Sequence, residues 1–208
     1  MNEKAYIIVT LLVTNVIKKV TMKNSEKTLL YLLKHPKEEF HIRGLERKLG
    51  IAVQIISRSL KQLEKEGLVK IKIAGKQKFA RFIFSEKSKS LSAYLLEKEK
   101  EEAKPELQPI ISRLEELKVK IIVLFGSSLK SLAKANDIDA LFIDDMLNAK
   151  QIDKDTTKLS AELPKPVVPL LLETKDAKKQ YDKPAVQEAL AGIVVKGFKE
   201  YAELMGAL

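Results

Sequence analysis

The sequence predicts an α+β fold in two parts. Apolar residues make up 45% of the chain and charged residues 32%, but aromatic residues only 6%, a balance typical of a helix-rich protein rather than a β-sandwich. In the first half, apolar residues at helical spacing are followed by the pattern of a β-hairpin. In the second half, segments rich in β-branched residues, typical of strands, alternate with helical patterns. A length of 208 residues suits one large domain or two small ones.

Several classes of protein are excluded by what the chain lacks. It has no Cys and two His residues, so disulfide scaffolds, zinc fingers, Cys nucleophiles and His-centred triads are excluded, and any metal must bind carboxylate oxygens. Residues 1–20 form an apolar N-terminal segment that is too short to span a membrane and has no signal-peptide cleavage pattern. We therefore expect a cytoplasmic protein with no membrane partner. Alternatively, Met22 is the biological start.

The first structured part is predicted to begin with helices. Ser25 is the expected N-cap of a helix whose apolar face ends before His35. After a short extended segment at 40–42, residues 43–49 are predicted to form a second helix. Gly50 closes this helix, because a residue without Cβ readily adopts the left-handed conformation of a tight turn.

A third helix and a hairpin follow. The third helix is predicted over 53–65, where Val53, Ile56, Leu60 and Leu63 form one apolar stripe. The sequence then alternates over 68–73, turns at Ala74-Gly75-Lys76 and returns over 77–84, which predicts a β-hairpin.

Residues 85–104 are charged and helix-favouring, so they predict a connecting helix between parts at 21–84 and 105–208. In the second part, residues 119–125 are typical of a strand buried on both faces of a sheet. We expect a mixed sheet with flanking helices. Helices are expected at 109–117, after a turn at 126–128 and reaching 135, and at 152–163, 184–190 and 198–205; further strands are expected at 138–143, 167–172 and 193–195.

Positive charge is concentrated in the first half. Residues 1–104 hold 23 Lys and Arg against 12 Asp and Glu, and residues 41–84 hold 11 against 3. A solvated Lys-rich surface usually mixes both signs of charge, so this excess favours a module that binds a polyanion.

Two segments of the first half are similar to a known class of DNA-binding domain. They are Ile42-Arg-Gly-Leu-Glu-Arg-Lys-Leu-Gly-Ile51 and Ser57-Arg-Ser-Leu-Lys-Gln-Leu-Glu-Lys-Glu-Gly-Leu-Val69. With the order helix, helix, helix and hairpin, residues 25–84 resemble a winged helix-turn-helix domain of prokaryotic transcription regulators. Ala52 departs from the pattern, since a capping Ser, Thr or Asn is common there. The resemblance implies double-stranded DNA as partner; RNA and protein remain alternatives. It places Gln54, Ser57, Arg58 and Lys61 at base edges and Lys72, Lys76, Lys78 and Arg81 at phosphates.

The second half contains a candidate phosphate site. Gly126, Ser127 and Ser128 follow a buried strand, and a turn there that opens a helix would present backbone N–H groups and a hydroxyl to a phosphate. Asp137 and Asp139 are two residues apart on the next expected strand, so both carboxylates would project from one face. Such a pair is suited to Mg²⁺ ions bound to a triphosphate.

This arrangement of Leu124-Phe-Gly-Ser-Ser128 and Asn136-Asp-Ile-Asp139 resembles the minimal nucleotidyltransferases of the DNA polymerase β superfamily, over residues 105–205. The resemblance implies Mg²⁺ and NTP as cofactors and a third carboxylate on a following strand. Our expected register places Pro169 at that acidic position, and Glu173 is the one substitute on the strand. The loop also lacks a second Gly. These departures predict impaired or absent catalysis.

The favoured function is therefore that of a DNA-binding protein, a transcription regulator, whose nucleotidyltransferase-like half is impaired and senses a nucleotide, mediates association or is a relic. The alternative is an active Mg-dependent nucleotidyltransferase that transfers an NMP to a protein, RNA or small molecule, as in toxin–antitoxin systems. A third reading is a scaffold that binds proteins through both halves. A homodimer is expected, because winged helices often read paired half-sites and the apolar N-terminal segment offers a surface to bury.

Overall fold

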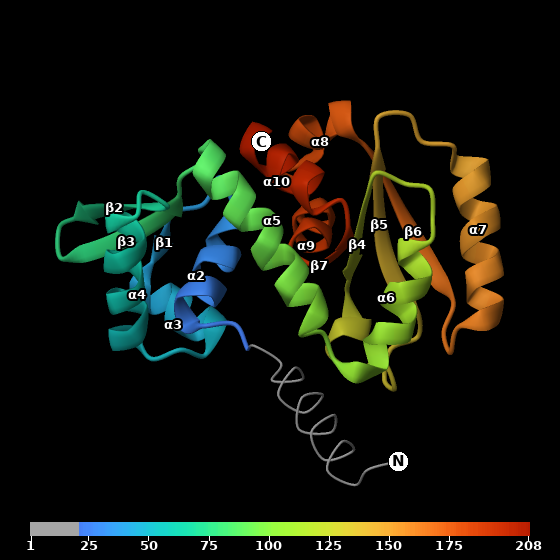
Figure 1. Ribbon diagram of the computed structural model, residues 1–208, viewed down its shortest axis with the longest axis horizontal. Coiled ribbons are helices and arrows are strands. Elements are labelled where there is room, and N and C mark those ends of the chain that lie inside the picture. Colours follow the sequence, from blue (N-terminus) through green and yellow to red (C-terminus); the bar gives the residue numbers. More distant parts are fainter. Residues whose placement is uncertain (1–20) are drawn as a thin grey trace, which may run out of the picture.

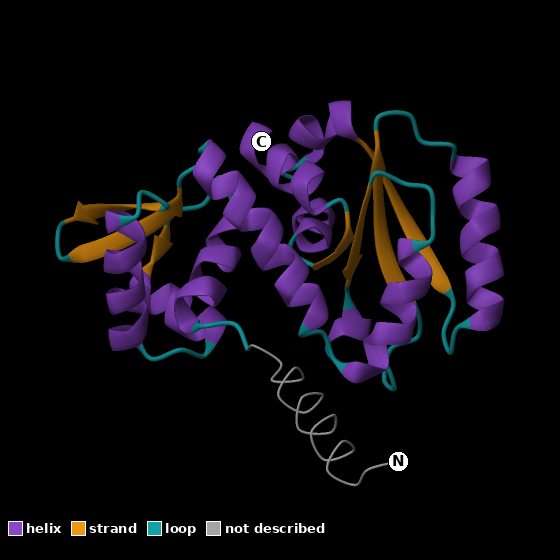
Figure 2. Ribbon diagram, in the orientation of Figure 1, coloured by secondary structure: helices purple, strands orange, loops and turns teal. Residues whose placement is uncertain are grey.

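The structure, a computed structural model, describes residues 21–208. The apolar N-terminal segment, and with it the surface expected to bury a dimer contact, lies outside these residues. The expected α+β class is confirmed, and Figure 2 shows the strands in two groups with helices between and around them. Within the described part of the chain, no helix is both long enough and apolar enough to span a membrane.

The first part contains a three-stranded antiparallel sheet in the order β1-β3-β2. Its elements match the predicted order of helices and hairpin, and the third helix has the predicted bounds. These elements are α2 (Asn24–Leu33), β1 (Phe40–His41), α3 (Ile42–Leu49), α4 (Val53–Lys65), β2 (Val69–Ala74) and β3 (Gln77–Phe82).

Two helices of the first part begin without a Ser, Thr or Asn at the N-cap position. The prediction of Ser25 as N-cap was wrong, because Lys23 is the N-cap of α2 and its N–H donates to the Glu26 carboxylate at 2.7 Å. The missing cap at Ala52 is replaced from α3, since the N–H of Val53 donates to the Glu46 carboxylate at 3.2 Å. The Gly50 prediction is confirmed, with φ of 65° at the end of α3.

The second part contains a four-stranded mixed sheet in the order β6-β5-β4-β7, in which only β5 and β6 run parallel. Apolar side chains cover both faces of β4, as predicted, and helices pack on each face of the sheet. The elements are α5 (Glu86–Glu101), α6 (Gln108–Glu115), β4 (Ile121–Phe125), β5 (Ile138–Asp144), α7 (Ala149–Glu162), β6 (Val167–Glu173), α8 (Thr174–Gln180), α9 (Pro184–Leu190), β7 (Ile193–Lys196) and α10 (Phe198–Ala207).

Two elements of the second part were predicted incorrectly. The short helix expected after the turn at Gly126–Ser128 and reaching Ala135 is replaced by a single 3-10 turn at Ser127–Leu129, and the chain then runs through turns to β5. Phe125, the last residue of β4, is paired with Asp139 near the start of β5. The segment between the two strands therefore brings the chain back to the edge of the sheet where β4 ends. Helix α8 was not predicted, because its one buried residue, Ala177, gives no apolar stripe.

Helix α5 is a shared part of the core rather than an exposed connector. It runs between the hairpin-bearing part and the four-stranded sheet (Figure 1), and it packs against α2, α10 and β7. Leu95 and Leu96 of α5 are 1% and 0% exposed, and they belong to a continuous apolar core that reaches from α2–α4 to one face of the sheet. The two parts therefore share one core.

A buried lysine strengthens this junction. Lys34, just after α2, is 5% exposed. Its ammonium donates to both carboxylate oxygens of Glu99 on α5, at 2.7 and 2.6 Å, and to the carbonyl oxygen of Gly192 before β7 at 2.5 Å. One side chain thus ties α2, α5 and the four-stranded sheet together.

Candidate nucleic-acid interface

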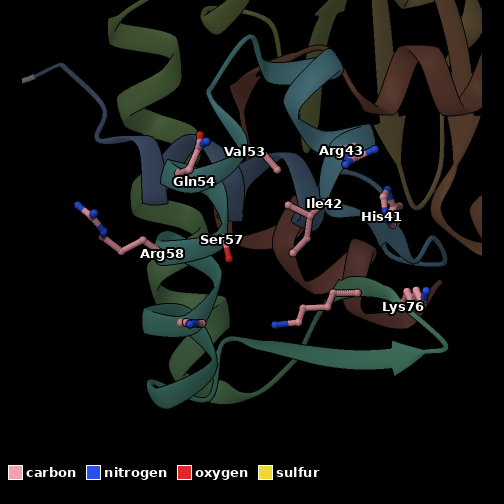
Figure 3. A pocket seen from close by; sticks show the side chains of 10 residues that line it. His41, Ile42, Arg43, Val53, Gln54, Ser57, Arg58 and Lys76 are labelled. Carbon is pink, nitrogen blue, oxygen red and sulfur yellow. The ribbon is translucent and has the colours of Figure 1, made fainter.

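A groove of about 570 Å³ lies between α4, the start of α3 and the hairpin. Figure 3 shows it from close by, with α4 on one side and the β2–β3 hairpin below. The stripe of α4 that packs inward (Ile56, Leu60 and Leu63) leaves the opposite face of the helix exposed. We call this site the basic groove; its lining residues are His41, Ile42, Arg43, Val53, Gln54, Ser57, Arg58, Lys61, Lys76 and Lys78.

The basic groove carries five cationic side chains and no acidic lining residue. Each of these cations is exposed, and none forms a hydrogen bond or ion pair with another residue in the described part of the chain: Arg43, Arg58, Lys61, Lys76 and Lys78. Elsewhere in the molecule, by contrast, lysines such as Lys98 and Lys100 pair with carboxylates. A concave surface with five unpaired positive charges attracts an anionic ligand of matching extent.

Two glutamates on the helices of this unit do not line the groove, and each binds a backbone N–H group. Glu46 accepts from the N–H of Val53, as described above, and Glu64 on α4 accepts from the N–H of Ile71 at 3.0 Å. Both bonds also fix the position of α4, one relative to α3 and the other relative to the hairpin. The two glutamates therefore help to position α4 while the lining of the groove itself contains no acidic residue.

Six of the eight residues predicted to contact DNA line the basic groove, namely Gln54, Ser57, Arg58, Lys61, Lys76 and Lys78. The other two, Lys72 and Arg81, do not line this groove. Lys72 is paired with Phe79 and Arg81 with Lys70, whereas Lys78 is paired with Ile73. Since side chains alternate along a strand, Lys72 and Arg81 project from the opposite face of the hairpin. There they line a separate hollow with Glu39, and Lys72 pairs with Glu39 at 3.6 Å.

Sequence reasoning missed His41 and Arg43 as groove residues. The sequence did indicate that an extended segment at 40–42 leads directly into the second helix. The residues at this junction lie beside α4, which is why His41 and Arg43 line the groove. The His41 ring also packs edge-on against Phe79 of β3, with the ring centroids 5.6 Å apart. This contact joins the rim of the groove to the hairpin.

In the second half, the structure brings the Gly-Ser turn and Asp139 together. Gly126 has φ of 78°, and a Cβ there would collide with the Asp139 carboxylate, so only glycine fits. Ser127 is exposed next to it. Ser128 is 0% exposed, and its hydroxyl donates to the carbonyl oxygen of Phe125 at 3.3 Å. The hydroxyl of Ser128 therefore faces the protein interior, so of the two serines it is that of Ser127 that is open to a ligand.

Asp139 is the second residue of β5, and Asp137 lies just before the strand. Partial burial, and then the charges of Asp137 and of Glu188 on α9, raise the pKa of Asp139 above the usual value for an aspartate. Two like charges beside a half-buried carboxylate are unfavourable in the absence of a counter-ion. Among residues 21–208, however, no group of three or more acidic or His side chains is close enough together to hold a metal ion.

Pro169, the residue expected at the acidic position of β6, is opposite Ala140. Val168 is opposite Asp139, and its side chain is 45% exposed. Glu173 is opposite Asp144, at the far end of the ladder. Five residues of strand span about 16 Å, so Glu173 is not a metal ligand together with Asp139. The position opposite Asp139 on β6 is therefore apolar, so β6 offers no third carboxylate there within the described residues.

The raised pKa of Asp139 leads us to predict how its replacement changes the thermal unfolding temperature. A carboxyl group with a raised pKa in the folded state lowers stability above its unfolded-state pKa, because its ionised form is less favourable when folded. Asp139→Asn removes the charge and keeps the shape that packs on Gly126. We expect thermal unfolding of the variant at a higher temperature than wild type at neutral pH, with the gain lost near about pH 3, where the wild-type carboxyl is mostly protonated. A lower unfolding temperature at neutral pH would contradict this assignment; Asp153→Asn on exposed α7 is the control.

No protein-family model matches the chain, and comparison with curated proteins and with solved structures found no match either. Function is therefore inferred from the geometry and charge of its own residues.

Proposed function

We propose that the first part of this protein binds double-stranded DNA through the basic groove, in the manner of a winged helix-turn-helix transcription regulator. The observation that supports this proposal is the set of five unpaired, exposed cations on α4, α3 and the hairpin turn, which face one concave surface. The free face of α4 is the only long helical surface at this groove, so it is the element that enters the DNA.

The dimensions of the two partners agree. An α-helix with its side chains is about 10–12 Å across, and the major groove of B-form DNA is about 12 Å wide. When α4 occupies the major groove, the hairpin turn at Gly75 and Lys76 lies beside the phosphate backbone. Lys76 and Lys78 then contact phosphates, which strengthens binding without distinguishing one base sequence from another.

For the second half, we propose a nucleotidyltransferase-like domain that has lost catalysis. Its mixed sheet and the contact between Gly126 and Asp139 support the resemblance, and the apolar Val168 opposite Asp139 supports the loss. Because this half shares a core with the DNA-binding part, it holds that part in a fixed orientation. A cytoplasmic location and a homodimer that reads paired half-sites belong to the same proposal.

The proposal predicts a steep dependence of DNA affinity on salt. Each phosphate neutralised contributes about −0.9 to the slope of log affinity against log salt. The four groove cations other than Arg58, which is placed at a base edge, therefore give a slope of about −3.6. Between 50 and 200 mM salt, affinity for a duplex is then expected to fall by about 150-fold. Fluorescence anisotropy with a labelled duplex, at four salt concentrations in that range, measures the slope. A slope near zero, or no duplex binding at low salt, would contradict the proposal.

A further inference from the structure

Two side chains on α4 are placed to read bases, and they differ chemically from the other groove residues. Gln54 and Arg58 are exposed, lie in the first two turns of α4 and have no partner within the described chain. In Figure 3 both project outward from the helix rather than into its packing face. The N-terminal turns of a groove-inserted helix come closest to base edges, so these positions are the ones that meet the bases.

Their spacing sets the distance between the bases that they reach. Residues four apart lie on the same face of a helix and are separated by about 6 Å along its axis. Successive base pairs are about 3.4 Å apart. When α4 follows the major groove, Gln54 and Arg58 therefore reach bases one or two base pairs apart.

The two side chains select different bases. The Gln amide has a donor and an acceptor that match N7 and N6 of adenine, and the Arg guanidinium has paired donors that match O6 and N7 of guanine. Lys61, Lys76 and Lys78 are point charges at the groove, suited to phosphates. Ser57 lies between the two readers and bonds to either kind of group.

From these observations we infer that the DNA site of this protein contains an adenine and a guanine one or two base pairs apart, the adenine read by Gln54 and the guanine by Arg58. The inference rests on the proposed DNA-binding function and specifies its ligand. Replacing either base is expected to weaken binding about tenfold to a hundredfold, the usual effect of losing one bidentate base contact.

The test is selection of binding sites from a library of duplexes with a randomised central region, carried out with the full chain. The wild-type protein is expected to select the adenine–guanine pair. Arg58→Gln is expected to replace the selected guanine by adenine, and Gln54→Ala to remove the preference for adenine alone. Lys78→Ala is the matched control, because loss of a phosphate contact lowers affinity for all sequences and leaves the selected site unchanged.

The outcomes separate this inference from the function on which it rests. Salt-dependent binding without any selected site, or a selected site that neither Arg58→Gln nor Gln54→Ala changes, would overturn the inference and leave duplex binding intact. Failure of the wild-type chain to bind duplexes at all would overturn both. Because Gln54 and Arg58 are exposed, these variants are expected to fold, and circular dichroism checks that they do.

Discussion

Joint replacement of Arg58 and Lys61 by alanine is expected to weaken binding to duplex DNA by about a hundredfold. Arg58 is assigned a base contact worth about 1–3 kcal/mol and Lys61 an adjacent ionic contact, and neither side chain has a partner in the described chain that would mask its loss. Both residues are exposed on α4, so the fold is expected to be unaffected. The dissociation constant for one duplex at one salt concentration is the measurement.

The matched control removes the same amount of charge elsewhere. Lys154 and Lys158 are also exposed and four residues apart on one helix, α7, which lies at the opposite end of the molecule from the hairpin (Figure 1). Their joint replacement by alanine is expected to change affinity by less than about threefold, because exposed charges beyond a screening length of about 10 Å contribute little. Equal losses in the two double variants would indicate non-specific attraction and contradict the basic groove as the binding site.

The largest effect on stability is expected from Lys34→Met. Methionine keeps an apolar stem of similar length, but it leaves the Glu99 carboxylate and the Gly192 carbonyl without their shared donor. Leaving one partner of a mostly buried ion pair uncompensated costs about 3 kcal/mol, which for a chain of this size lowers Tm by about 6–12 °C. Because the two parts also share the apolar core around Leu95 and Leu96 of α5, we expect the variant still to unfold in one transition.

Lys37→Met is the matched control for this stability change. Lys37 also reaches from the first part to the second, where it lies 3.8 Å from Asp182, but both side chains are exposed. An exposed ion pair contributes about 0–1 kcal/mol, so this variant is expected to remain close to wild type. Equal destabilisation by the two variants would show that burial of Lys34 is unimportant, and two separate unfolding transitions would contradict the shared core.

Much of the first part could be predicted from sequence, because its signals are local. The stripe at Ile56, Leu60 and Leu63 and the glycine at Gly50 predicted the bounds of α4 and the end of α3, and the structure has both. The face of the hairpin could not be predicted to the same degree. A turn of three residues at 74–76 was expected, but Ala74 pairs with Gln77, so the turn is Gly75-Lys76 alone.

This difference of one residue decides which cations face the basic groove. With the longer turn, Lys72 would be paired with Lys78 and the two would share a face. The observed pairing of Lys72 with Phe79 separates them, because a shift of one residue moves every side chain of a strand to the other face. The charge of the hairpin was therefore predictable, whereas its direction depended on the geometry of one tight turn.

The second half shows the same limit for a parallel pair of strands. Strands β5 and β6 are joined through α7, and such a long connection fixes no register between them. The local motif at Gly126 and Asp139 came together as the sequence indicated. The residue opposite Asp139 on β6, which the sequence alone did not identify, is Val168.

The most direct test of the basic groove is an NMR titration of the full chain with an unlabelled duplex, which maps the contact surface whether or not the site is known. We expect the largest amide shifts in residues 53–61 of α4, at the start of α3 and at the hairpin turn around Lys76. Shifts concentrated instead around Lys70, Lys72 and Arg81, on α7, or nowhere in the chain would contradict DNA binding by the basic groove.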